Sequence, residues 1–146
     1  MTLKIKKLND LAIEPKLGSE EAAGIDLYAA SSQDIWIEPS ETVMIGTGLA
    51  IELEKGTFGG IFARSGLACK QGLRPANCVG VIDSDYRGEL IVALHNDTKE
   101  SQLVPAQSRI AQLVVLPYIK IEDIELTDEL SDTERGEGGF GSTGIK

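Results

Sequence analysis

The ten residues from 135 to 144 read RGEGGFGSTG, and their types indicate binding to a phosphate chain and a flat ring. The Arg135 guanidinium can fork onto a phosphate, and the Ser142 and Thr143 hydroxyls can donate hydrogen bonds to it. Phe140 can stack on a base. Five of these ten residues are glycine, so ordering the segment costs about 1–2 kcal/mol of backbone entropy per residue. We therefore expect an arm that closes over a nucleotide only when an anionic ligand holds it.

Composition alone also fits a plain glycine-rich tail. The pattern G-x-G-x-x-G occurs at Gly136, Gly138 and Gly141, but a dinucleotide fingerprint needs a strand before it and a helix after it. Only five residues follow Gly141, so no helix can open there. The P-loop pattern is absent from the sequence. A phosphate site would therefore combine separate parts of the chain.

A second polar cluster lies in residues 80–90, GVIDSDYRGEL, between two apolar runs. Aspartates in a turn are ordinarily turn formers, which is the interpretation we favour for Asp85. A calcium loop is excluded because an arginine and a leucine stand at two positions that need oxygen ligands. Asp83 follows apolar residues, so we expect its carboxylate to be partly desolvated and able to act as a base on water.

Length and composition limit the class of protein. The 146 residues, 42% of them apolar and 5% aromatic, predict one domain with a mostly aliphatic core. The formal net charge of −9 argues against nonspecific nucleic-acid binding. Neither a signal peptide nor a membrane-spanning run is recognisable, so we expect a cytoplasmic or nuclear protein that is not secreted. The two cysteines lack a C-x-x-C spacing, which favours reduced structural thiols, and His95 is expected to be a plain strand residue.

Short β-branched segments separated by turn residues predict an all-β sandwich or barrel. We expect strands at Asp34–Ile37, Val43–Leu53, Phe58–Ala63, Glu89–Asn96 and Arg109–Pro117. Around Ser65 to Lys70 we expect one helical turn, with Ser65 as its cap and its first amides available to an anion. The chain then divides into a β core over residues 1–117, a connector over 118–134 with seven acids and one base, and a glycine-rich lid arm over 135–146.

Five segments resemble, in order and spacing, the motifs of the trimeric dUTP pyrophosphatases (dUTPases). They are AGIDLYA at 23–29, ARSGLA at 63–68, GVIDSDYRG at 80–88, RIAQL at 109–113 and RGEGGFGSTG at 135–144. The resemblance implies a distorted β jelly-roll barrel or sandwich with one short helix. It also implies a homotrimer whose active sites are shared between subunits and closed by a mobile C-terminal arm. Alanine at 63 and Gln-Ser at 107–108 depart from the residues common in the family, which affects loop geometry more than reacting groups.

The resemblance implies hydrolysis of dUTP to dUMP and pyrophosphate, with Asp83 activating the water that attacks the α-phosphorus. Tyr86 would pack on the deoxyribose and exclude a 2′-hydroxyl, and the hairpin at 80–82 would read uracil. The implied substrate-binding residues are Arg64, Ser65, Gly66, Asn77, Gly80, Val81, Ile82, Tyr86, Ile91, Gln112, Arg135, Phe140, Gly141, Ser142 and Thr143. Mg²⁺ would be chelated by the phosphates, with Asp26 reaching it through water. The expected role is to limit uracil incorporation into DNA and to supply dUMP for thymidylate synthesis.

Two other functions remain possible from the sequence. A dCTP deaminase would share the fold, but the resemblance to that family is poor at Asp83–Tyr86 and in the tail. A nucleotide-sensing trimer would keep the site only for binding, and an intact Asp83 argues against it because a pure binder needs no base. Release of pyrophosphate from dUTP, dCTP, dTTP and UTP would separate these functions.

Overall fold

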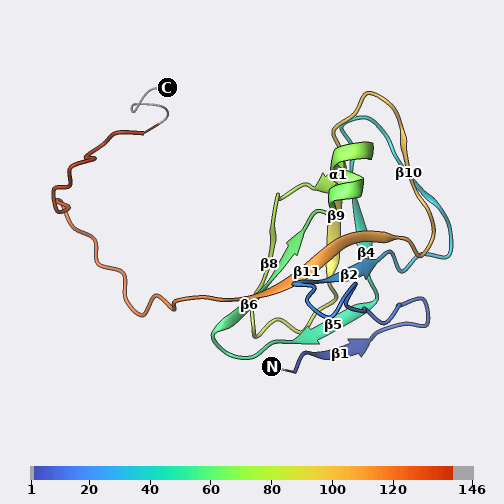
Figure 1. Ribbon diagram of the computed structural model, residues 1–146, viewed down its shortest axis with the longest axis horizontal. Helices are drawn as coiled ribbons and strands as arrows, with labels where there is room; N and C mark the ends of the chain where they lie inside the picture. The colour runs from blue at the N-terminus through green and yellow to red at the C-terminus, as the bar shows by residue number, and fades with distance from the viewer. Residues whose placement is uncertain (1, 140–146) are drawn as a thin grey trace.

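The computed structural model describes residues 2–139, and within them the chain forms eleven strands and one short helix (Figure 1). In chain order these are β1 Lys4–Lys7, β2 Gly24–Tyr28, β3 Ile35–Ile37, β4 Thr42–Gly46, β5 Leu49–Glu52, β6 Thr57–Phe62, α1 Ser65–Gln71, β7 Leu73–Pro75, β8 Gly80–Ile82, β9 Ile91–Asn96, β10 Gln102–Val104 and β11 Arg109–Pro117. The expected all-β class with one short helix is confirmed.

The strands form four antiparallel sheets. The largest has the order β2-β11-β6-β8, a second has the order β4-β9-β7, and the pairs β1-β5 and β10-β3 complete the fold. Neighbours in these sheets are far apart in sequence, so most contacts are long-range, as in a jelly roll. Within the described residues the sheets do not close into a barrel. Of the two expected architectures, barrel or sandwich, a closed barrel is therefore not formed by these residues.

Strand β9 shows the alternation of a strand with one buried face. In β9 the side chains of Val92, Leu94 and Asn96 are buried while the residues between them are more exposed. The core is aliphatic, as the composition predicts. Its largest fully buried apolar side chains are Leu27, Ile37, Leu49, Leu73, Leu90, Leu94, Ile110, Leu113, Val92 and Val104.

The segment 43–53, predicted as one strand, is two. The chain leaves β4 after Gly46 and enters β5 at Leu49, and Gly48 between them has φ +66°. A side chain there would be strained and would also collide with Ala12 and Asn9. The glycine therefore breaks a run whose apolar pattern reads as continuous.

The strand predicted from Glu89 begins later, at Ile91. The Glu89 carboxylate instead accepts a hydrogen bond from the Gly48 amide at 2.7 Å, tying the β4–β5 turn to the segment before β9. The remaining strand predictions agree with the structure to within one residue. Strands β1, β2, β7, β8 and β10 were not predicted.

The predicted helical turn is present as α1, but its cap is not Ser65. Arg64 occupies the N-cap position with an extended backbone and makes no side-chain capping hydrogen bond, while Ser65 is the first helical residue. The helix ends at Gly72, which has the left-handed φ of 62° common after a helix.

Residues 118–139 contain no helix or strand. The Tyr118 amide still donates to the Gly56 carbonyl at 3.1 Å, and the residues after it extend away from the β core (Figure 1). Aliphatic side chains in this segment are strongly exposed, with Ile119 and Leu126 each 96% accessible. Across residues 2–139, no helix is long and apolar enough to cross a membrane.

Candidate functional site

The largest sheet, β2-β11-β6-β8, is called the central sheet, and it places three polar or aromatic residues side by side. Gln112 on β11 is paired with Asp26 on β2 and with Phe62 on β6. Residues directly opposite one another in antiparallel strands share a face of the sheet. The register therefore brings segments separated by more than 80 residues, AGIDLYA and RIAQL, to one place.

Asp26 holds two arginines. Its Oδ1 accepts a hydrogen bond from Arg64 Nε at 2.8 Å, and its Oδ2 accepts one from Arg109 Nη1 at 3.2 Å. The Asp26 side chain is 21% exposed, so both ion pairs are partly shielded from water. One carboxylate thus holds two cationic side chains next to each other.

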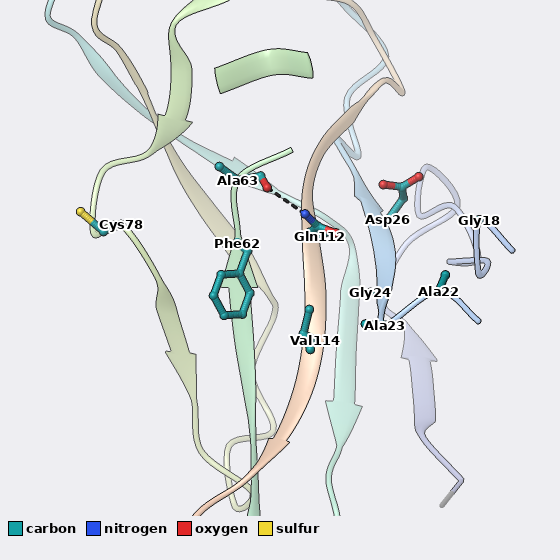
Figure 2. A pocket seen from close by; sticks show the side chains of 10 residues that line it. All are labelled: Gly18, Ala22, Ala23, Gly24, Asp26, Phe62, Ala63, Cys78, Gln112 and Val114. Carbon is teal, nitrogen blue, oxygen red and sulfur yellow. Dashed lines mark hydrogen bonds between the residues drawn. The ribbon is translucent and has the colours of Figure 1, made fainter. Parts of the chain in front are cut away.

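A pocket of about 750 Å³ lies beside this pair. Figure 2 shows its lining across three neighbouring strands, with Gln112 between Phe62 and Asp26. The Gln112 amide donates to the Ala63 carbonyl at 2.9 Å. The lining residues are Gly18, Ala22, Ala23, Gly24, Asp26, Phe62, Ala63, Cys78, Gln112 and Val114.

The start of α1 follows directly from this pocket. Arg64 follows β6 and is the N-cap residue of α1. The next two residues, Ser65 and Gly66, begin the helix and are exposed. The first amides of a helix have no intrahelical acceptor, so they remain available as donors. The sequence expectation of an anion-accepting turn here stays a prediction, now with Arg64 rather than Ser65 as the N-cap.

The segment predicted as a base-reading hairpin is not a paired hairpin, because β7 pairs with β9 and β8 pairs with β6, so residues 76–79 connect two different sheets. The name hairpin is kept for the segment made of β7, residues 76–79 and β8. Gly80 pairs with Ile61 and Val81 with Gly60, so β8 is the edge strand of the central sheet. A Cβ on Gly80 would lie 3.2 Å from Ile61 Cβ and 3.4 Å from Asn77 Nδ2, which leaves little room for any larger residue. Asn77 is exposed at the tip.

The turn after β8 contains Asp83 and Tyr86. The Tyr86 amide donates to the Asp83 carbonyl at 3.1 Å, and Arg87 Nη1 donates to the Ser84 and Tyr86 carbonyls at 2.7 and 2.8 Å. The Tyr86 hydroxyl donates to the Glu89 carbonyl at 3.1 Å. Tyr86 and Arg87 thus brace the turn that carries Asp83.

The Asp83 side chain is exposed in the single chain, contrary to the partial desolvation expected from the apolar residues before it. Those residues belong to β8, whose side chains alternate between faces, so they do not surround the carboxylate. Desolvation of Asp83 would need a surface that one chain does not provide.

The predicted site residues fall into two groups in one chain. Asp83, Tyr86, Ile91, Val81 and Ile82 line a separate pocket of about 310 Å³, together with Met44 and Glu89. Asp26 and Gln112 line the larger pocket described above. Asp83 and the residues of the β2–β11 region are therefore not brought into one pocket by a single chain.

Arg135 lies on the segment that runs away from the core, where its Nε donates to the Gly138 carbonyl at 2.8 Å. It contacts neither pocket. Phe140, Gly141, Ser142 and Thr143 lie outside the described residues.

Within residues 2–139, no group of three or more histidine, cysteine or acidic side chains could hold a metal ion by itself. Asp26 supplies one carboxylate in a pocket open to a ligand. A single carboxylate suits Mg²⁺ that keeps its waters and takes its other oxygens from phosphates. The donor set therefore fits the metal binding mode expected from the sequence.

Arg109 and Glu89 are functional candidates that the sequence reasoning did not assign. Arg109 was within a recognised segment, yet its pairing with Asp26 depends on the β2–β11 register. Glu89 lies in the pocket of Asp83 and Tyr86. Cys69 and Cys78 are both free and exposed, and Cys78 lines the larger pocket.

Known proteins are similar to this chain over nearly its whole length. The family model described as dUTPase matches residues 10–144. The deoxyuridine 5′-triphosphate nucleotidohydrolase of Nautilia profundicola is 53% identical over 144 residues, covering 99% of each chain. The protein of the same name from Escherichia phage T5 is 47% identical over 137 residues, covering 90% of this chain and 92% of that one.

A solved structure gives the same result. The dUTPase of Staphylococcus bacteriophage 80alpha, in a mutant form with dUpNHpp, superposes with a TM-score of 0.85 at 30% identity and covers 99% of each chain. The fold and the ordered motifs define an enzyme class of β jelly-roll nucleotidohydrolases. The chain belongs to the dUTPase family. The expected jelly-roll class and the expected enzyme class are thereby confirmed.

Proposed function

We propose that this chain hydrolyses dUTP to dUMP and pyrophosphate by attack of an activated water on the α-phosphorus. The single observation that carries the proposal is the match to the dUTPase family over residues 10–144, with all five motif segments in order. The relatives that share this length are named for the same substrate.

Asp83 is the proposed general base. It lies in a turn braced by Arg87 and by the Asp83–Tyr86 backbone hydrogen bond, so its position is fixed relative to the hairpin. A carboxylate can accept the proton of an attacking water when the two are held within hydrogen-bonding distance. Asp85, two residues further on, has no comparable place in the pocket of Tyr86 and Ile91.

Recognition of the base and sugar is assigned to the same region. The backbone of Gly80, Val81 and Ile82, with Asn77, would pair with the donor and acceptor pattern of uracil. Cytosine presents the reverse pattern, and a site built for hydrogen bonds rejects a mismatched partner by about 10⁴-fold. Tyr86 would close the space at C2′, and Ile91 would add apolar contact beside it.

The phosphate chain is assigned to cationic and amide donors. Arg64, Ser65 and Gly66 would hold it at the start of α1, and Gln112 would contact the α-phosphate. Arg135 with Gly141, Ser142 and Thr143 would hold the γ-phosphate while Phe140 covers the uracil. Bound Mg²⁺ would neutralise charge on the three phosphates, with Asp26 as the protein carboxylate next to it.

A homotrimer with shared sites is the proposed assembly. Its support is the separation of the two pockets in one chain, since Asp83 and Gln112 line different ones. A second copy could bring the missing phosphate donors to Asp83 and cover its exposed carboxylate. The exposed apolar residues Met44, Val81 and Ile91 around the smaller pocket also favour an intersubunit surface.

The proposed physiological role follows from the products. Removing dUTP would limit uracil incorporation into DNA, and the dUMP would serve thymidylate synthesis. A soluble cytoplasmic or nuclear location remains part of this proposal.

The test is pyrophosphate release measured side by side with dUTP, dCTP, dTTP and UTP in Mg²⁺. We expect turnover of dUTP to exceed that of each other nucleotide by at least about 10²-fold in kcat/KM. Equal turnover of dCTP would contradict the proposed base reading. Ammonia release from dCTP would instead indicate deamination, and tight binding of dUTP without turnover would indicate a sensor.

A further inference from the structure

An ion pair outside the candidate site connects to the hairpin that the proposal above assigns to the base. Arg74 Nη2 donates to Asp97 Oδ1 at 2.9 Å, and Arg74 Nε donates to the other oxygen of the same carboxylate. This is the two-point geometry in which a guanidinium and a carboxylate fix each other's orientation. The Asp97 carboxylate raises the pKa of Arg74, chiefly through these hydrogen bonds.

The same guanidinium also contacts the hairpin backbone. Arg74 Nη1 donates to the Pro75 carbonyl at 3.2 Å. That carbonyl accepts the Cys78 amide at 3.1 Å, the hydrogen bond that closes the turn between β7 and β8. A continuous chain of polar contacts therefore runs from Asp97 through Arg74 to the tip that carries Asn77.

The turn needs such support because its backbone is unusual. Cys78 has φ +61°, in the left-handed region that non-glycine residues rarely adopt. Residues in this region persist only where surrounding contacts hold them. A second donor on the Pro75 carbonyl holds one end of the turn in place.

Asp97 is itself rigidly placed. Its amide donates to the Gly72 carbonyl at the end of α1 at 2.9 Å. The preceding Asn96 is fully buried, and its Nδ2 donates to the Ile37 and Glu100 carbonyls at 2.9 and 2.8 Å. Asn96 Oδ1 accepts the Thr98 amide at 2.8 Å. The carboxylate that orients Arg74 thus projects from a loop anchored on both sides.

Two other side chains face this pair from β9 and β4. His95 Nε2 lies 3.5 Å from Asp97 Oδ1, and His95 Nδ1 is 2.8 Å from Thr42 Oγ1. Arg74 and His95 are also cross-strand partners between β7 and β9. The pair is therefore part of a small polar network on the β4-β9-β7 sheet.

We propose that Arg74 and Asp97 are positioning residues that hold the β7–β8 hairpin in the conformation that binds the uracil base. This inference rests on the proposed role of the hairpin. Neither side chain is expected to touch the substrate. They act through the Pro75 carbonyl, so their loss should weaken base binding without removing a reacting group.

The test compares Asp97→Asn with Glu100→Gln in the full chain. Both changes convert one carboxylate of the same loop into an amide, but the Glu100 carboxylate has no hydrogen bond or ion pair among residues 2–139. Binding of dUMP and of inorganic pyrophosphate is measured by calorimetry, together with kcat and KM for dUTP. Thermal unfolding of each variant checks that it is folded.

For Asp97→Asn we expect the Kd for dUMP and the KM for dUTP to rise by about 3- to 30-fold, the range of such indirect couplings. We expect pyrophosphate binding and kcat to change by less than about twofold, because uniform binding energy lost at the base raises KM alone. Glu100→Gln should match the unsubstituted protein. Arg74→Lys, which keeps the charge but not the two-point geometry, should shift dUMP binding in the same direction.

Three results would overturn the inference: unchanged dUMP binding in folded Asp97→Asn and Arg74→Lys, equal weakening of dUMP and pyrophosphate, or an equal loss in Glu100→Gln. If Asp97→Asn does not fold, Arg74→Lys alone decides between these outcomes. Unsubstituted protein that binds dCMP as tightly as dUMP would instead contradict the base-reading role of the hairpin itself, and the inference with it.

Discussion

Asp26 on β2 and Arg64, the N-cap residue of α1, are joined by a 2.8 Å hydrogen bond across the intervening strand β11. Arg109 on β11 contacts the other oxygen of the same carboxylate. Two guanidiniums are thus held together by one anion beside the larger pocket. Asp26 thus holds the Arg64 and Arg109 side chains in place before a phosphate binds. Binding then costs less side-chain entropy.

Replacing Asp26 by asparagine should therefore destabilise the protein, because two neighbouring guanidiniums lose their shared anion. We expect the free energy of unfolding in urea to fall by about 1–3 kcal/mol, the scale of hydrogen bonds to charged groups. Asp10→Asn is the matched control, since the exposed Asp10 makes no side-chain hydrogen bond within the described chain. Equal stability of the two variants would show that the Asp26 pairs contribute nothing.

Asp83→Asn should lower kcat by at least about 10²-fold while leaving dUTP affinity nearly unchanged, as expected for loss of a general base. Asp85→Asn, in the same turn, is the control and should retain most of its turnover. The measurement is single-turnover hydrolysis combined with binding of a non-hydrolysable analogue. Near-normal turnover in Asp83→Asn would reject the assignment.

Tyr86 is predicted to act as a steric filter on the sugar. Tyr86→Ala should reduce the preference for dUTP over UTP in kcat/KM, because the ring no longer occupies the space at C2′. Tyr86→Phe keeps the ring and loses only the hydroxyl that donates to the Glu89 carbonyl, so it should keep the preference. If the alanine variant stays as selective as the unsubstituted protein, the filter lies elsewhere.

Ending the chain after Glu134 should leave the core folded, since every strand lies before residue 118 within the described part of the chain. Turnover should nevertheless collapse, because Arg135 and the glycine-rich residues after it are removed. Circular dichroism and pyrophosphate release measured on the same sample test both statements. Full activity of the shortened chain would argue against a catalytic arm.

Mixing two inactive chains tests whether the arm acts on a neighbouring subunit. Asp83→Asn chains and chains ended after Glu134 are combined at equal concentration under conditions that exchange subunits. In a cyclic trimer with shared sites, about three-quarters of the trimers are mixed and about a quarter of all sites regain both intact groups. No recovered activity after confirmed exchange would mean that each arm covers its own chain's Asp83.

The sequence predicts the long strands well because short apolar, β-branched runs bounded by turn residues are a local property of the chain. The β11 strand is predicted at its observed bounds, Arg109–Pro117. Gly48 was missed as a strand break because neither its positive φ nor its close approach to Ala12 and Asn9, which are distant in sequence, is visible in the apolar pattern. The core, connector and arm division stays a prediction.

For the candidate site, too, the sequence predicts some features and not others. Residue types and motif order pointed to Asp26, Asp83 and Gln112, but not to how they are arranged. The Asp26–Arg109 contact depends on the β2–β11 register, which one sequence does not specify. The exposure of Asp83 also could not be predicted, because burial is set by surfaces that fold against it and not by its neighbours in the chain.

The exposed segment after Pro117 makes the chain open to selective proteolysis. Lys120 lies in this segment, beyond the last strand and fully on the surface. A protease specific for basic residues should cleave the peptide bond after Lys120 much faster than bonds within the sheets, since cleavage requires an accessible, locally extended backbone. One cut there would separate the intact β fold from every residue of the arm, so the rate of that cut measures how much of the time another surface shields the connector.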